Sequence, residues 1–225
     1  MSEIIRIRAR LFDAAATCAS TDDFRPSLRG VYVQPHPEGG AVMLATDGYR
    51  FVVVRDETGV CAEPRIILAD KALRRALRSV KGDQALTVTA EGHVLVADQP
   101  ELTGLTSAGD WISWQRAFTP LLDLIKTKAP AAHATFNPHY LGSFGKVAER
   151  LNPTAYQGIR VIALSDSDPA LVLFPYIPDV FGVLMPMRGG NEQAFPAWFK
   201  PVLGPKKRAR RKLPANDTAK LAEAA

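Results

Sequence analysis

Cysteine is scarce in this sequence: only Cys18 and Cys61 occur among 225 residues. Two cysteines can form neither a framework of several disulfides nor a four-cysteine zinc site, so we expect a reducing, cytoplasmic compartment. The four histidines are scattered, and none of them belongs to an HExxH or CxxC zinc motif. We therefore predict no metal site and no other cofactor.

Long apolar runs are also missing. No run approaches the roughly 18–20 residues that a membrane-spanning helix needs, and residues 1–10 do not follow the pattern of a signal peptide. Hydrophobic residues make up 47% of the chain and charged residues 23%, a balance that excludes wholesale disorder. The sequence thus predicts a folded protein with no membrane partner.

Signatures of catalysis are absent as well. The chain has no Gly-x-Ser-x-Gly nucleophile elbow, and residues 46–48 lack the glycine–lysine pattern of a phosphate-binding loop. Asp166 and Asp168 could suggest a pair of metal-binding carboxylates, but their position between two expected strands favours a β-turn. We predict that the protein is not an enzyme.

The formal net charge of +5 comes from the C-terminal segment. Residues 204–225 hold seven cations and two carboxylates, whereas the rest of the chain holds 21 of each. We expect the basic run at residues 206–212 to be disordered, where it could contact phosphates or simply solubilise the chain. Three aromatic residues lie within residues 194–199, which favours docking on the protein's own body or on a neighbouring chain.

A weak internal repeat organises the chain up to about residue 190. Each unit reads as a strand, a helix and three further strands, and the helices begin near residues 10, 70 and 138. A parallel α/β sheet would alternate single strands with single helices, so this order predicts an α+β fold of three βαβββ half-units, with helices on one face of antiparallel sheets. The expected strands are 4–8, 30–33, 41–46 and 50–55, then 65–68, 85–89, 93–98 and 101–107, then 132–136, 159–164, 170–174 and 181–185. The expected helices are 10–20, a second from 70 and a third from 137.

The second predicted helix has an uneven distribution of charge. Leu73, Leu77 and Val80 share an apolar stripe, while cations occupy the remaining face with no carboxylate between residues 70 and 83. Mutual repulsion among these cations is easiest to understand if a polyanion approaches. The alternative is a solvated face whose acids come from elsewhere in the fold. The cations expected to contact a polyanion are Lys71, Arg74, Arg75, Arg78 and Lys81, with Lys146 and Arg150 on the third helix.

Several short motifs occur in an order typical of one protein family. They are residues 23–31 (DFRPSLRGV), 45–51 (ATDGYRF), 136–141 (FNPHYL) and 183–188 (VLMPMR). The first two resemble the central domain of the bacterial sliding clamp, the DNA polymerase III beta subunit, and the last two resemble its final domain. Residues 111–118 (WISWQRAF) take the place of the linker between those domains.

The resemblance implies a ring-forming fold in which helices line a central hole and their cations face double-stranded DNA without reading its sequence. It also implies a pocket that binds peptides of a DNA polymerase or other clamp-binding proteins. Without the resemblance, the two methionines would merely end a strand and Asp47-Gly48 would merely turn a hairpin. The implied pocket residues are Thr46, Gly48, Tyr49, Arg50, Phe51, Arg116, Ala117, Met185, Pro186 and Met187.

The chain also departs from the family. It resembles a shortened clamp that lacks the first domain and half of the last, and Tyr49 stands where the family usually has histidine. We expect a two-half-unit domain at 1–117, a single half-unit at 118–190 and a tail at 191–225. The unpaired third half-unit would expose its apolar helix stripe, so we expect self-association into a dimer or tetramer. The resulting hypothesis is a processivity factor for a DNA polymerase. The alternative is an interaction module that binds clamp-binding peptides, or a full-length clamp, without encircling DNA.

Overall fold

The computed structural model describes residues 2–97, 99–107, 111–127, 134–153 and 158–188. Contacts between residues group 1–190 in one compact unit and 191–225 in another. The predicted basic run and the aromatic segment at 194–199 lie outside the described residues. The described residues all belong to the first unit.

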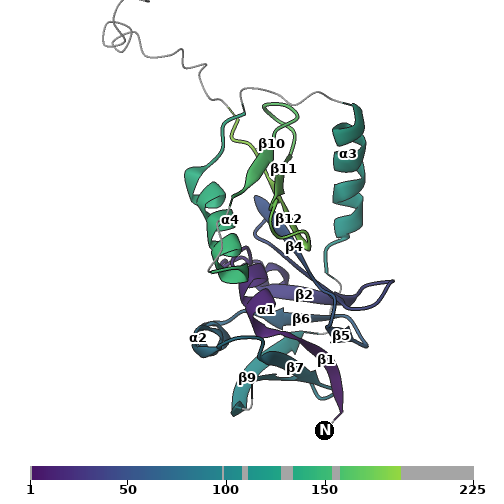
Figure 1. Ribbon diagram of the computed structural model, residues 1–225, viewed down its shortest axis with the longest axis vertical. Coiled ribbons are helices and arrows are strands. Elements are labelled where there is room, and N and C mark those ends of the chain that lie inside the picture. The colour runs from purple at the N-terminus through teal and green to yellow at the C-terminus, as the bar shows by residue number, and fades with distance from the viewer. Residues whose placement is uncertain (1, 98, 108–110, 128–133, 154–157, 189–225) are drawn as a thin grey trace, which may run out of the picture. The chain divides into compact units, whose positions relative to one another are not determined.

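The described residues form antiparallel strands and α-helices (Figure 1). The strands are β1 (Glu3–Arg8), β2 (Gly30–Pro35), β3 (Ala41–Thr46), β4 (Arg50–Asp56), β5 (Val60–Cys61), β6 (Arg65–Leu68), β7 (Ala85–Thr89), β8 (His93–Val96), β9 (Gln99–Ser107), β10 (Arg160–Ile162), β11 (Ala170–Leu173) and β12 (Val180–Leu184). The helices are α1 (Ala9–Ala16), α2 (Lys71–Ser79), α3 (Trp114–Thr127) and α4 (Pro138–Leu151). The prediction of an α+β fold with antiparallel sheets is confirmed.

All of these strands join one continuous sheet in the order β10-β11-β12-β4-β3-β2-β6-β9-β8-β7-β1-β5. The first two half-units exchange their first strands: β1 pairs with β7, and β6 pairs with β2. Neither half-unit can therefore complete its sheet alone. This exchange makes the first two half-units a single folding unit.

The third half-unit extends the same sheet through its last strand. β12 pairs with β4, with Phe181 opposite Val53 and Val183 opposite Phe51. The backbone N–H of Met185 continues this ladder by donating to the Tyr49 carbonyl at 2.9 Å. The junction places the end of β12 beside the hairpin between β3 and β4.

Alternate residues of the central strands face two separate apolar clusters. On β3, Met43 and Ala45 belong to the larger cluster, and Val42 and Leu44 belong to the smaller one. Buried residues of α1, α2 and α4 contribute to the larger cluster, whereas Phe118 of α3 contributes to the smaller one. Figure 1 shows α4 and α3 on opposite sides of the strands. We call the side with α1, α2 and α4 the inner face and the other the outer face.

The helix of the third half-unit packs against α1 on the inner face. Phe144 and Val147 are fully buried and Leu151 is only 6% exposed, because these residues join the core around Phe12. The expectation that this apolar stripe would be exposed is therefore wrong. Pairing of β12 with β4 brings α4 beside α1, and the stripe is covered within one chain.

Some expected boundaries also differ from the structure. Residues 111–118 were expected to be a linker, yet α3 begins at Trp114, and its apolar side chains cover the outer face. The expected strand at 132–136 is not found at 134–136, and residues 132–133 lie outside the described part. α1 ends at Ala16 instead of residue 20, because the N–H groups of Thr17, Cys18 and Ala19 bond to carbonyls three residues back. None of the described helices has the length and apolarity to cross a membrane.

Candidate peptide pocket and basic helix face

The hairpin between β3 and β4 is held by its own side chains. Gly48 has φ of +94°, a conformation that favours glycine. Thr46 Oγ1 donates to the Arg50 carbonyl at 2.7 Å and accepts from the Gly48 N–H at 3.0 Å. Asp47 Oδ1 accepts from the N–H groups of Tyr49 and Arg50 at 3.0 and 3.1 Å. The hairpin therefore presents Tyr49 and Arg50 in a fixed orientation.

Arg50 is oriented by contacts on two sides. Its Nε lies 2.9 Å from Asp47 Oδ2, and its guanidinium carbon lies 5.3 Å from the centre of the Tyr140 ring of α4. Tyr140 in turn stacks on Tyr49 with the ring centres 5.6 Å apart. The Arg50 side chain is only 10% exposed, so its main contacts are within the protein, where it joins the hairpin to α4.

An apolar cavity of about 320 Å³ opens beside this hairpin. Its wall combines the hairpin with the end of β12, the start of α3 and the residues before β2. Six of the predicted pocket residues line it: Thr46, Gly48, Tyr49, Arg50, Phe51 and Met185. The other lining residues are Leu28, Ile112, Phe118, Leu121, Pro169 and Val183, which the sequence did not single out.

Of the remaining predicted pocket residues, Pro186 and Met187 are not among the described residues that line the cavity. Pro186 and Met187 follow the end of β12, where the Met187 N–H donates to the Thr135 carbonyl at 2.7 Å and the side chain is 49% exposed. Arg116 and Ala117 lie in the first turn of α3, and their side chains are outside the described part. The linker segment at residues 111–118 thus contributes Ile112 and Phe118 to the pocket.

Aromatic rings make the floor of the pocket rigid. The ring of Phe118 lies edge-on to Phe51 at 4.9 Å and to Phe181 at 5.6 Å, and Phe51 also contacts Trp111 at 5.9 Å. Phe118 and Leu121 are three residues apart and share one helix face. This spacing is the signal by which α3 and its pocket residues could have been predicted.

α2 begins where the sequence predicts but ends at Ser79, because Val80 takes an extended conformation; Val80 and Lys81 therefore follow the helix. Asp70 caps it, accepting the Leu73 N–H at 2.7 Å, and Leu73 and Leu77 are buried in the inner cluster. Lys71, Arg75, Arg78 and Lys81 are exposed. Arg74 is half-buried, and its Nε donates to the Ala69 carbonyl at 2.7 Å. On α4, Lys146 is exposed and Arg150 is partly buried.

One acid from α1 lies among these arginines. Asp13 Oδ2 is 2.8 Å from Arg150 Nε, and Arg150 also donates to Thr17 Oγ1. Burial raises the pKa of Asp13, although attraction to Arg150, Arg74 and Arg78 acts in the opposite direction. Asp13 thus supplies one acid from elsewhere in the fold to Arg74, Arg78 and Arg150.

The arginines also affect one another across the three helices. Burial lowers the pKa of Arg74; attraction to Asp13 opposes this, whereas repulsion by Arg150, Arg78 and Arg50 adds to it. Arg10 on α1 lies 2.9 Å from Asp83, which follows α2. Positive side chains from α1, α2 and α4 therefore gather on the inner face. Arg10 and Asp13 were missed because a short, mostly buried helix gave no sign that its polar residues meet the other two helices.

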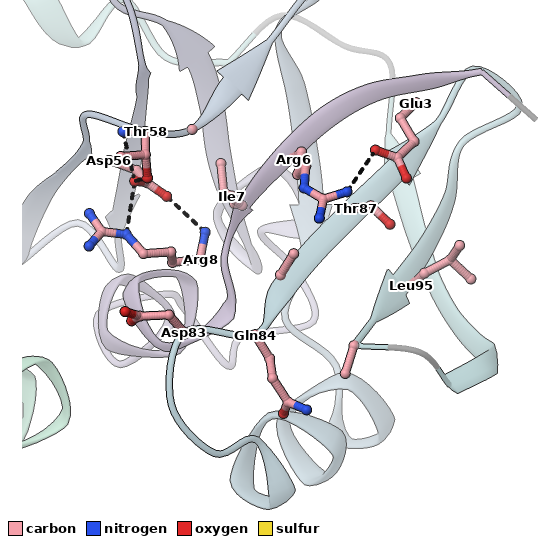
Figure 2. A pocket seen from close by; sticks show the side chains of 13 residues that line it. Glu3, Arg6, Ile7, Arg8, Asp56, Thr58, Asp83, Gln84, Thr87 and Leu95 are labelled. Carbon is pink, nitrogen blue, oxygen red and sulfur yellow. Dashed lines mark hydrogen bonds and ion pairs between the residues drawn. The ribbon is translucent and has the colours of Figure 1, made fainter.

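A second, larger cavity of about 640 Å³ lies beside β1, β7 and β8 (Figure 2). Its charged groups are already paired: Arg8 Nε lies 2.9 Å from Asp56 Oδ1, and Arg6 lies 3.4 Å from Glu3. Asp56 is fully buried and also accepts from the Arg8 N–H and from Thr58. This network fastens the turn after β4 onto β1, so we assign the cavity a structural role. Within the described ranges, no group of three or more His, Cys, Asp or Glu residues could hold a metal ion.

Comparison with solved structures identifies the architecture. The chain aligns with the beta sliding clamp of C. crescentus at a TM-score of 0.59 and 18% identity, covering 84% of this chain and 66% of that one. The DNA polymerase sliding clamp of Pseudomonas aeruginosa gives a TM-score of 0.60 at 17% identity, covering 83% and 66%. This chain has the sliding-clamp fold.

The resemblance to sliding clamps is therefore confirmed at the level of the fold. The DNA polymerase III beta subunit of Thermotoga maritima matches at a TM-score of 0.58 and 12% identity, covering 84% of this chain and 67% of that one. The chain thus spans about two thirds of the clamps that it matches. No family model and no curated protein matches the sequence.

Proposed function

We propose that this protein is a shortened sliding-clamp-like processivity factor that assembles on duplex DNA and tethers a polymerase or repair protein. The observation that carries the proposal is the clamp fold with arginines and lysines of α2 and α4 gathered on its inner face. These cations match a phosphate backbone, and such contacts carry no sequence information. The expected DNA contacts are Lys71, Arg74, Arg75, Arg78, Lys81, Lys146 and Arg150.

A matched pair of charge reversals tests DNA binding. Lys71 and Arg75 are exposed on α2, so the double variant K71E/R75E keeps the buried contacts of Arg74. The control R6E/R160E makes the same change in charge on the outer face, where Arg6 and Arg160 alternate with inward residues of β1 and β10. We expect the first variant to lose duplex affinity and the second to keep it. Equal loss in both would contradict a localised DNA-binding face.

We propose further that the pocket beside the β3–β4 hairpin receives apolar side chains of a partner's peptide. Its lining is apolar, it is formed within one chain, and Met185 supplies an adaptable side chain at its rim. A clamp-binding peptide from a bacterial polymerase is the suitable probe. We expect Met185→Ala to weaken peptide binding by about tenfold, or roughly 1.4 kcal/mol. Met187→Ala, outside the lining, serves as the control, and an equal effect of both variants would remove the pocket assignment.

Encircling DNA requires more than one copy of this chain. Among the described strands, β10 and β5 are the last at the two edges of the sheet, and open sheet edges can pair with a second copy. We propose a homo-oligomer, either a dimer or a tetramer, in place of the expected association through the helix stripe, which is buried. Light scattering at micromolar concentration tests this, and a strictly monomeric species on and off DNA would defeat it.

The alternative is a clamp-derived module that binds peptides, or a full-length clamp, without encircling DNA. It is favoured by the formation of the whole apolar pocket within one chain that spans two thirds of a clamp. This module would bind the polymerase peptide with unchanged affinity in K71E/R75E and would bind duplex DNA weakly at every salt concentration. Neither proposal assigns catalysis to the protein.

A further inference from the structure

α1 carries a polar stripe on a helix that is otherwise buried. Arg10, Asp13 and Thr17 are spaced at three and four residues, so they share one side of the helix. Asp13 pairs with Arg150 at 2.8 Å, and Thr17 accepts a second hydrogen bond from the same guanidinium. Two groups on α1 therefore fix the direction in which Arg150 points.

Asp13 is a largely buried carboxyl group among arginines. Its side chain is 15% exposed, and burial raises its pKa in spite of three nearby arginines. A carboxyl group whose pKa is raised by folding stabilises the folded state at a pH below its pKa in the unfolded chain, 3.8. This stabilisation is lost as the pH rises through the pKa in the folded chain. Loss of the Asp13 proton therefore costs more free energy in the folded chain than in the unfolded chain.

Resting on the proposed DNA-binding role of the inner face, we propose that Asp13 is a positioning residue that restrains the affinity of this face for DNA. Its carboxylate occupies the Nε–H of Arg150 and neutralises one charge among Arg74, Arg78 and Arg150. A DNA phosphate approaching the same guanidinium competes with Asp13 for its donors. A limited affinity suits a protein that moves along DNA, because each additional phosphate contact strengthens the binding and has to be broken during movement.

The test measures duplex affinity against salt concentration for the full chain. Asp13→Asn removes the competing charge, and we expect tighter binding with a slope of log affinity against log salt that is steeper by about 0.9, as one more phosphate contact gives. Arg150→Gln breaks the same pair but removes the cation, so we expect that the slope does not become steeper and that binding is not tightened. The control Glu3→Gln breaks the pair with Arg6 on the outer strand β1 and should leave the slope unchanged.

The two variants separate this role from a structural one. If the Asp13–Arg150 pair only holds α1 to α4, both variants weaken DNA binding together, and that result would overturn the inference. Thr17→Val loosens Arg150 without changing charge and should act in the same direction as Asp13→Asn, which keeps the test decisive if Asp13→Asn folds poorly. If the unmodified chain does not bind duplex DNA at low salt, the proposed function itself fails and the inference with it.

Discussion

At the scale of single residues, burial decides which groups can react. Cys18 is fully buried between α1 and α4, and burial raises the pKa of its thiol to about 12. Cys61 is 9% exposed, and burial raises the pKa of its thiol to about 11. Because the thiolate is the reactive form, neither cysteine is suited to nucleophilic or redox chemistry in the folded protein.

We predict that both thiols react slowly with a thiol reagent at pH 8, and that two equivalents react rapidly once the chain is unfolded. The variant Cys61→Ala isolates Cys18, which should be the slower of the two. The raised pKa values also imply that the stability contributed by the protonated thiols is present below about pH 9 and is lost as the pH rises through 11–12. Labelling of native Cys18 at the rate of a free thiol would contradict the packing of α1 against α4.

At the scale of elements, the junction between β12, β4 and α4 depends on a residue without a side chain. A Cβ added to Gly182 of β12 would collide with the ring of Phe144 and approach the Phe51 carbonyl oxygen to 3.0 Å. A Cβ added to Gly142 or Gly145 of α4 would instead enter open space, with no atom of a neighbouring residue within 4 Å. The same substitution should therefore have opposite effects at these sites.

We predict that Gly182→Ala lowers the free energy of unfolding by about 1–3 kcal/mol, the usual cost of overpacking a core. Gly142→Ala should raise it by about 0.5–1 kcal/mol, because alanine is the better helix former. Chemical denaturation of both variants and of the unmodified protein measures the difference. An unchanged free energy of unfolding in Gly182→Ala would show that Phe144 of α4 does not pack closely against Gly182 of β12.

Many of the strand and helix boundaries could be predicted from the sequence. β3, β6 and β7 begin and end at the expected residues, because alternation of apolar side chains and turn signals agree there. The exchange of β1 and β6 between half-units could not be predicted, because it depends on pairing between distant segments. α3 was missed because the resemblance assigned residues 111–118 to a linker, and the pocket was therefore predicted without Phe118 and Leu121.

At the scale of the whole molecule, the fold explains how a nearly neutral body can present a basic surface. The excess charge of the sequence lies in residues 204–225, so the inner face must arise from segregation of cations on α2 and α4. Charges segregated on rigid helices attract a polyanion to a fixed surface, whereas a charged tail attracts it without fixing its orientation. The basic helices, not the tail, are therefore expected to determine how DNA lies on the protein.

We predict that a variant ending at Leu203 keeps most of its salt-dependent affinity for duplex DNA, measured beside K71E/R75E in the full chain. The truncated variant loses seven cations and the double variant loses two, yet the double variant should bind more weakly. The opposite order would assign DNA binding to the tail.

The proposed function requires an assembly that encircles DNA, and retention on end-blocked DNA measures this property. The protein is allowed to thread onto linear duplex DNA, both ends are then blocked with bulky groups, and the complex is challenged with high salt and competitor DNA. We expect the protein to remain on blocked DNA and to leave DNA with open ends, since a closed assembly is lost only by sliding off. Equal dissociation from blocked and open DNA would contradict encirclement.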